Sequence, residues 1–175
     1  DPVGLELADD PGIDLVHEQL RIAAGEPLGY QQADIQPRGY AVECRVYAED
    51  PAAGFMPSTG KLIGYRPPSG PGVRVDSGVE EDAAIGVHYD PMIAKLIVWG
   101  EDRDAACAAL AAALGECEVA GVATNVALLE RVVAHEAFAT GRLDTGLIEK
   151  NHAALFPRPG RTPPLGLVAA AVDEL

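Results

Sequence analysis

Arg45 is the first residue whose type and spacing could do chemistry. It lies between Glu43 and Tyr47 in a stretch where apolar and polar residues alternate, so a strand would hold it rigidly. A guanidinium fixed in this way can present a fork of donors to a carboxylate-like or enolate-like oxygen. The alternative is an ion pair with a nearby acid such as Glu43, which is common at surfaces and contributes little. Spacing alone favours the ion pair.

Two further candidates lie downstream. Lys95 lies between two isoleucines on one face of a predicted strand, where a desolvated amine could act in chemistry. More often such a lysine buries its stem and keeps its ammonium group in water, and this interpretation is favoured. His88 and Asp90 share a side of an extended chain and could pair as a base and its orienting group. A turn that ends in Asp-Pro explains them more simply.

Other familiar sites are missing from the sequence. Residues 69–72 are rich in glycine but lack the G-x-x-x-x-G-K-[ST] pattern, so a hairpin turn explains them better than a phosphate site. The three cysteines, Cys44, Cys107 and Cys117, form no Cys-x-x-Cys pair that histidines could complete, so no metal site is expected. An odd number of cysteines with no visible targeting segment favours reduced thiols in the cytoplasm.

Charge and length exclude several classes of partner. The 175 residues contain 13 Lys and Arg against 27 Asp and Glu, which gives a net charge of −14. Nucleic acid and anionic lipid would repel such a chain. The apolar stretches are shorter than the ~20 residues that a membrane span needs. We therefore expect one domain of a size that can form a core, with no nucleic-acid and no membrane partner.

The elements that must position these residues follow from apolar spacing. Residues 38–48 alternate, and one face of this predicted strand carries Tyr40, Val42, Cys44, Val46 and Ala48. Residues 61–66, 73–77 and 92–99 are further predicted strands, separated by Gly and Pro. Helices are predicted over residues 13–23, 102–114, 125–135 and 145–155, with Ile13, Val16, Leu20 and Ala23 on one face of the first. The fold class is α+β: an antiparallel sheet with flanking helices.

Six segments, in order along the chain, carry a resemblance. They read DLVHEQLRIAAGEPL (14–28), RGYAVECRVYAEDP (38–51), FMPSTGKL (55–62), GPGVRVDSGV (70–79), YDPMIAKLIVWGEDRDAA (89–106) and GVATNVALL (121–129). Together they resemble the C-terminal part of biotin carboxylase, as carried by the alpha subunits of biotin-dependent acyl-CoA carboxylases and by pyruvate carboxylase. The resemblance covers roughly residues 2–155.

The resemblance implies an activity and a residue that serves it. The family uses ATP and bicarbonate, assisted by Mg²⁺ or Mn²⁺, to carboxylate biotin, which is the first half-reaction of an acyl-CoA carboxylase. A family arginine, credited with stabilising negative charge on the ureido oxygen of biotin, lies on the strand matched by Glu43-Cys44-Arg45. Arg45 is therefore the predicted catalytic residue, acting as a pre-positioned cation.

The resemblance also divides the chain. Residues 1–37 correspond to the end of the ATP-grasp region with a connecting helix, residues 38–155 to the biotin carboxylase C-terminal domain, and residues 156–175 to a Pro-rich linker and the start of a further segment. The family's ATP-binding and metal-binding residues precede this region, and its base would fall just before Asp1. We therefore expect ATP and the metal to bind mainly outside this chain, and the isolated chain to be inactive.

The sequence departs from the family at four positions. Asp1 stands where the family has histidine, Gly4 where threonine is usual, Tyr40 where histidine is often seen, and Pro71 where a phenylalanine helps the bacterial enzyme to dimerise. The neighbouring arginine of that interface is kept as Arg74. Arg74 is thus either part of a homodimer interface or an ordinary surface residue of a strand.

The expected partners are the ATP-grasp portion of the same enzyme, a biotin carboxyl carrier domain and a carboxyltransferase subunit. Two other functions remain open from the sequence. The chain could be a free-standing, non-enzymatic module that assembles with a carboxylase, or a biotin-binding module derived from one.

Overall fold

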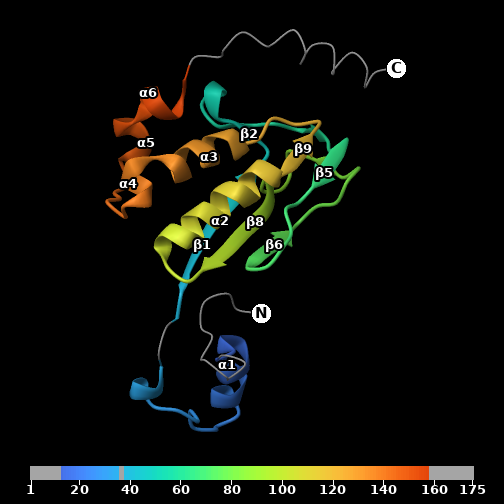
Figure 1. The fold of residues 1–175 in the computed structure, drawn as a ribbon. Coiled ribbons are helices and arrows are strands. Elements are labelled where there is room, and N and C mark those ends of the chain that lie inside the picture. Colours follow the sequence, from blue (N-terminus) through green and yellow to red (C-terminus); the bar gives the residue numbers. More distant parts are fainter. Residues whose placement is uncertain (1–12, 36–37, 158–175) are drawn as a thin grey trace.

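A computed structural model describes residues 13–35 and 38–157 of the chain (Figure 1). Its centre is a three-stranded antiparallel sheet in the order β1-β8-β6. These strands are β1 (Tyr40–Tyr47), β8 (Met92–Gly100) and β6 (Val73–Ser77). Helix α2 (Arg103–Glu116) packs along one face of the sheet, and α3 (Val126–Ala134) packs against α2. The described part is therefore an antiparallel sheet with helices on one side, as the alternation of residues 38–48 predicts.

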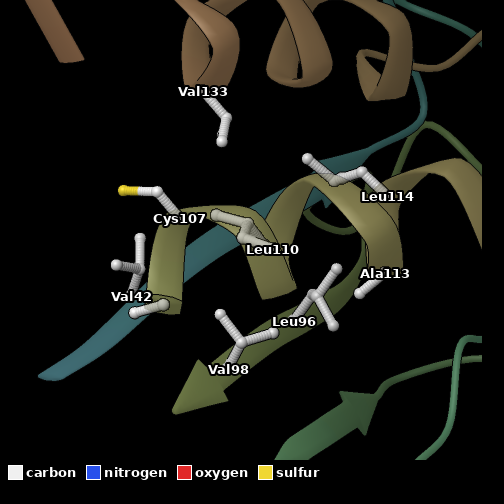
Figure 2. Packing of buried hydrophobic residues seen from close by; sticks show 9 residues of the cluster. Val42, Leu96, Val98, Cys107, Leu110, Ala113, Leu114 and Val133 are labelled. Atoms are coloured by element: carbon white, nitrogen blue, oxygen red, sulfur yellow. The ribbon is translucent and has the colours of Figure 1, made fainter. Parts of the chain in front are cut away.

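Helix α2 joins the sheet to the helical layer through one apolar face. The Asp102 side chain accepts a hydrogen bond from the Ala105 amide at 2.8 Å and so caps the first turn. The buried residues of α2 are Ala106, Cys107, Leu110, Ala113 and Leu114. They pack on Val42, Leu96 and Val98 from the sheet and on Val133 from α3 (Figure 2). This cluster anchors β1 and β8, the two strands that carry the candidate residues.

Short strand pairs extend the sheet region. These pairs are β2 (Glu49–Asp50) with β3 (Met56–Pro57), β4 (Gly60–Lys61) with β7 (Ala84–Ile85), and β5 (Gly64–Arg66) with β9 (Glu118–Ala120). The predicted strand over residues 61–66 is thus divided between β4 and β5. The predicted hairpin around residues 69–72 is wrong, because β5 pairs with β9 whereas β6 pairs with β8. A second core cluster, including Val46, Leu62 and Ile93, lies in this region.

The C-terminal helices are shorter than predicted. Residues 145–155 form two helices, α5 (Leu147–Lys150) and α6 (His152–Leu155), rather than one. The helix α4 (Glu136–Ala139) was not predicted; its first turn is capped by the His135 ring, which accepts from the Ala137 amide at 3.2 Å. Of the predicted linker at residues 156–175, residues 158–175 lie outside the described residues.

The N-terminal part of the described chain holds helix α1 (Leu15–Ala23) and a 3-10 helix at Gln32–Asp34. The Asp14 side chain caps α1 by accepting a hydrogen bond from the His17 amide at 2.9 Å. In Figure 1, α1 lies apart from the sheet and its helices. Its side chains at Val16 and Leu20 are 66% and 65% exposed. Of the apolar face predicted for this helix, Ile13 is buried, whereas the part formed by Val16 and Leu20 is exposed.

None of the helices formed by the described residues is long and apolar enough to cross a membrane. None of the histidine, cysteine, aspartate and glutamate side chains of these residues form a group of three or more that could hold a metal ion.

Candidate functional site

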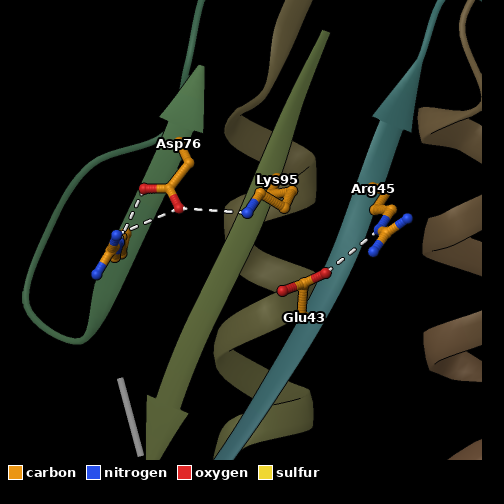
Figure 3. Close-up of polar contacts among 5 residues, drawn as sticks. Glu43, Arg45, Asp76 and Lys95 are labelled. Carbon is orange, nitrogen blue, oxygen red and sulfur yellow. Dashed lines mark hydrogen bonds and ion pairs between the residues drawn. The ribbon is translucent and has the colours of Figure 1, made fainter. Parts of the chain in front are cut away.

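The sheet has one open face, on the side away from α2. Strand register places Arg45 opposite Lys95 and Lys95 opposite Asp76, so that three charged residues form one row across the sheet. In the adjacent row, Glu43 and Arg74 flank an isoleucine of β8. Figure 3 shows the charged side chains of both rows standing on this face, with α2 behind the strands. The alternation of β1 thus separates a core face from a charged face, as predicted.

Arg45 is exposed on this face. Its Nε donates to Glu43 Oε1 at 3.4 Å, which is a long hydrogen bond, and the two side chains are 60% and 44% exposed. Hydrogen bonding with the Tyr47 side chain, and then with Glu43, raises the pKa of Arg45 above its ordinary value. The ion pair favoured from spacing is therefore present, but it holds the guanidinium weakly. Arg45 stays cationic and accessible to a ligand.

Lys95 is held by a carboxylate. Asp76 accepts from Arg74 Nε at 2.8 Å and lies 3.7 Å from Lys95 Nζ. The hydrogen bond from Arg74, more than the charge of Lys95, lowers the pKa of Asp76 below its usual range. The Lys95 side chain is 38% exposed, so its ammonium group lies at the surface beside Asp76. The favoured interpretation from the sequence, a buried stem with a solvated head, agrees with this placement.

His88 and Asp90 lie in an exposed loop before β8. The Asp90 carboxylate accepts a hydrogen bond from the Met92 amide at 2.8 Å, which is the local contact of an Asx turn. In the described part of the chain no hydrogen bond joins His88 to Asp90. The turn interpretation is thus supported, and the base-and-orienter pair is absent from this geometry.

Asn125 contacts the backbone of β1 at Arg45. From the sequence it is predicted only to begin a helix. It is 6% exposed. Its Nδ2 donates to the Arg45 carbonyl at 3.0 Å, and its Oδ1 accepts from the Tyr47 amide at 2.9 Å. Its distance of 80 residues from Arg45 in the sequence explains why local patterns could not reveal this contact. The only local signal was an asparagine directly before an apolar helical run.

Arg45 does not line either of two hollows on the described surface. One, of about 620 Å³, lies over β5 and β9 and is lined by Tyr65, Arg66 and Cys117 among others. The other, of about 450 Å³, lies between Ser77 and Ala83.

Burial raises the pKa of the Cys117 thiol. Burial, followed by the charge of Cys117, raises the pKa of the Cys44 thiol to about 12. Both thiols therefore stay protonated at neutral pH and are poor nucleophiles.

The open face can thus stabilise an anionic oxygen. An exposed, permanently charged guanidinium suits an oxygen on which negative charge develops. Lys95 and Arg74 both contact Asp76, whereas the ion pair of Arg45 with Glu43 is long, at 3.4 Å, so Arg45 is the residue of this face best placed to meet a ligand.

The chain matches, over residues 43–150, a family model that describes the biotin carboxylase C-terminal domain. The chain belongs to this family. The resemblance read from the six sequence segments is confirmed, and so is the α+β fold expected from it.

Relatives of this biotin carboxylase domain are larger proteins. It is 46% identical to the methylcrotonoyl-CoA carboxylase subunit alpha of Arabidopsis thaliana over 83% of this chain and 20% of the relative. It is 44% identical to the biotin carboxylase of Nostoc sp. over 79% of this chain and 31% of the relative. The chain therefore spans about a fifth to a third of the length of these relatives.

A solved structure shows the same fold. The biotin carboxylase domain dimer of Hydrogenobacter thermophilus 2-oxoglutarate carboxylase, in complex with MgADP, ADP and bicarbonate, has a TM-score of 0.78 and 39% identity. The match covers 84% of this chain and 32% of that one. The nucleotide, metal and bicarbonate belong to that larger domain.

Proposed function

We propose that this chain completes the biotin-facing wall of a longer biotin carboxylase, which uses ATP and bicarbonate to carboxylate biotin. The observation that carries the proposal is Arg45, an exposed guanidinium on the open face of a family-matched sheet. Biotin, when bound, supplies the ureido nitrogen that accepts the carboxyl group.

Arg45 fits this substrate by the chemistry of its donors. A guanidinium has five N–H donors in a fixed fork, and the contact with Glu43 uses only the one on Nε. As the ureido nitrogen loses its proton, negative charge develops on the ureido oxygen, and a cation already in place stabilises it without reorganisation. Glu43 keeps the guanidinium near the surface of β1. Their contact is a single long hydrogen bond and not a short bidentate salt bridge, so the positive charge stays available to a ligand.

The test is kinetic and uses the full-length protein. Arg45→Ala is expected to lower biotin carboxylation roughly 100- to 1000-fold, as the removal of one preorganised donor does in other enzymes. Bicarbonate-dependent ATP hydrolysis measured without biotin is expected to stay near wild type, because its chemistry lies elsewhere. The matched control is Arg66→Ala, which removes an exposed arginine paired with Glu118 at 3.3 Å. Wild-type carboxylation by Arg45→Ala would refute the role of Arg45.

The exposed face of α1 supports a contact with the ATP-grasp portion of the same polypeptide. Its large apolar side chains are about half to two thirds exposed: Leu15, Val16, Leu20 and Ile22. A group of such residues normally marks a surface that another part of a protein covers.

ATP and Mg²⁺ or Mn²⁺ would bind mainly in the ATP-grasp portion, and a carrier domain would bring biotin to the Arg45 face. A carboxyltransferase would then receive the carboxyl group, and the enzyme would work in the cytoplasm.

Arg74 supports a homodimer through the β6 edge. It lies on the open face, with Nε donating to Asp76 at 2.8 Å, and its side chain is 38% exposed. A partner subunit would meet β6, at the opposite side of the sheet from Arg45 on β1. The similar carboxylase domain of Hydrogenobacter thermophilus is itself a dimer.

A further inference from the structure

We propose that Asn125 is a positioning residue for Arg45, holding the backbone of β1 so that the guanidinium faces biotin in one direction. The inference rests on the proposed function, since it assumes that Arg45 acts on biotin. Asn125 itself touches neither the open face of the sheet nor any reacting atom; it acts through the strand.

The contact replaces a missing neighbouring strand. β1 lies at one side of the three-stranded sheet, so one edge of its backbone has no strand beside it. On that edge the carboxamide of Asn125 donates to the Arg45 carbonyl at 3.0 Å and accepts from the Tyr47 amide at 2.9 Å. The backbone amide of Asn125 also donates to the Tyr47 carbonyl, at 3.3 Å. These three bonds imitate a strand pair over two residues of β1.

The position of this contact matters because the other edge of β1 is irregular there. The ladder with β8 shifts register between Val46 and Tyr47: Val46 faces Ala94, whereas Tyr47 faces Met92. A register break loosens the constraint that a regular ladder places on the strand. Asn125 supplies hydrogen bonds directly across from this break, one residue on either side of Val46. The backbone direction at Arg45 is therefore fixed from the Asn125 side.

Arg45 depends on its backbone for direction. Its side chain is 60% exposed, and the contact with Glu43 is long, at 3.4 Å. The position of its Cα and the direction of its Cα–Cβ bond set which positions the guanidinium can reach, so a shift of the strand shifts all of them. Misplacement by about 1 Å can cost a catalytic group roughly 100-fold in rate.

The carboxamide of Asn125 is buried, and it hydrogen-bonds the Glu49 side chain of β2 as well as the backbone of β1. Asparagine often caps a helix through its side chain, but at α3 only its backbone carbonyl serves the helix, accepting from the Leu128 and Leu129 amides at 3.0 Å each. The side chain instead bonds the end of β1 and Glu49, which follows it in the chain. α3 packs on α2, and α2 packs on the sheet, so Asn125 connects a rigid helical layer to the strand that carries Arg45.

The experiment uses the full-length enzyme with Asn125→Ala, Asn125→Asp and the control Asn151→Ala. Aspartate keeps the acceptor for the Tyr47 amide and loses the donor to the Arg45 carbonyl. The control removes an amide that donates to the Leu147 carbonyl at 2.8 Å, away from the sheet. We expect Asn125→Ala to lower kcat for biotin carboxylation about 10- to 100-fold. Biotin-independent ATP hydrolysis should change less than about twofold, as should both activities of Asn151→Ala.

Two further readouts separate positioning from general stability. Combining Asn125→Ala with Arg45→Ala should cost no more than Arg45→Ala alone, because the two act as a unit. Hydrogen exchange measured by mass spectrometry should rise in peptides that cover β1, while peptides that cover β6 stay as in wild type. If Asn125→Ala does not fold, Asn125→Asp is judged by the same criteria.

Three results would overturn the inference: wild-type kcat in both Asn125 variants, parallel losses of carboxylation and ATP hydrolysis, or additive losses with Arg45→Ala. Failure of the proposed function looks different, because Arg45→Ala itself would then retain wild-type carboxylation. That result would also rule out the positioning role of Asn125. If Arg45→Ala lowers carboxylation but the Asn125 variants do not, only the positioning role is ruled out.

Discussion

Arg103, the first residue of α2, ties three parts of the fold together, and its replacement should destabilise the chain clearly. Its Nε donates to the Ala139 carbonyl at 3.2 Å, and its Nη2 donates to the Phe138 carbonyl. Its Nη1 donates to the Tyr40 hydroxyl at 2.6 Å. The guanidinium also lies 5.3 Å from the Tyr40 ring centre and 5.2 Å from that of Phe138. Arg103 thus joins β1, α2 and α4.

The expected loss follows from these contacts. For a partly exposed arginine, the two bonds to carbonyls are worth about 1 kcal/mol each, and the two ring contacts about 0.5 kcal/mol each. Arg103→Ala should therefore lower the free energy of unfolding by about 3 kcal/mol. Arg103→Lys keeps the charge but cannot reach both carbonyls and the tyrosine from one nitrogen, so it should cost about 1–2 kcal/mol.

The assay is urea unfolding of the purified chain, followed by far-UV circular dichroism. Arg66→Ala serves as the control, because its ion pair with Glu118 is 80% and 67% exposed and should be worth about 0.5 kcal/mol. The expected order of destabilisation is Arg103→Ala, then Arg103→Lys, then Arg66→Ala. An Arg103→Lys variant as stable as wild type, or equal losses for Arg103→Ala and Arg66→Ala, would show that the fork geometry does not stabilise this fold.

Two other predictions concern pH and assembly. Burial, followed by the charges of Cys117 and Glu43, raises the pKa of Cys44 from 9.0 to about 12, so the folded chain retains a proton that the unfolded chain loses. The stabilising contribution of Cys44 should be complete below pH 9 and disappear as pH rises toward 12. The measurement is the free energy of unfolding of wild type and Cys44→Ala over this pH range. Equal slopes of that free energy against pH would contradict the prediction. For the proposed dimer, Arg74→Ala should weaken self-association of the full-length protein in sedimentation velocity, and an unchanged dimer would argue against an interface at β6.

The alternation of residues 38–48 was enough to predict which face of β1 carries Arg45. Val42 and Val46 are buried while Glu43 and Arg45 are exposed, because side chains of a strand point alternately to its two faces. The start of α2 could also be predicted from the sequence, because the Asp102 cap and the apolar spacing after it are local signals. Local patterns therefore placed the strand and the helix that carry and support the candidate site.

Pairing between distant segments could not be predicted in the same way. β5 finds its partner in β9, across a separation of more than fifty residues, so the Gly-rich turn between β5 and β6 gave a false impression of a hairpin. Asn125 was missed for the same reason. The role of its carboxamide depends on the packing of α3 beside β1, and no local spacing encodes that arrangement.

A crystal structure of the full-length protein with biotin, ADP and bicarbonate bound would show directly whether Arg45 meets biotin. We expect an Arg45 guanidinium nitrogen within about 3 Å of the biotin ureido oxygen, on the open face of the sheet. Biotin bound with its ureido oxygen on another cation, and Arg45 beyond hydrogen-bonding reach, would contradict this expectation.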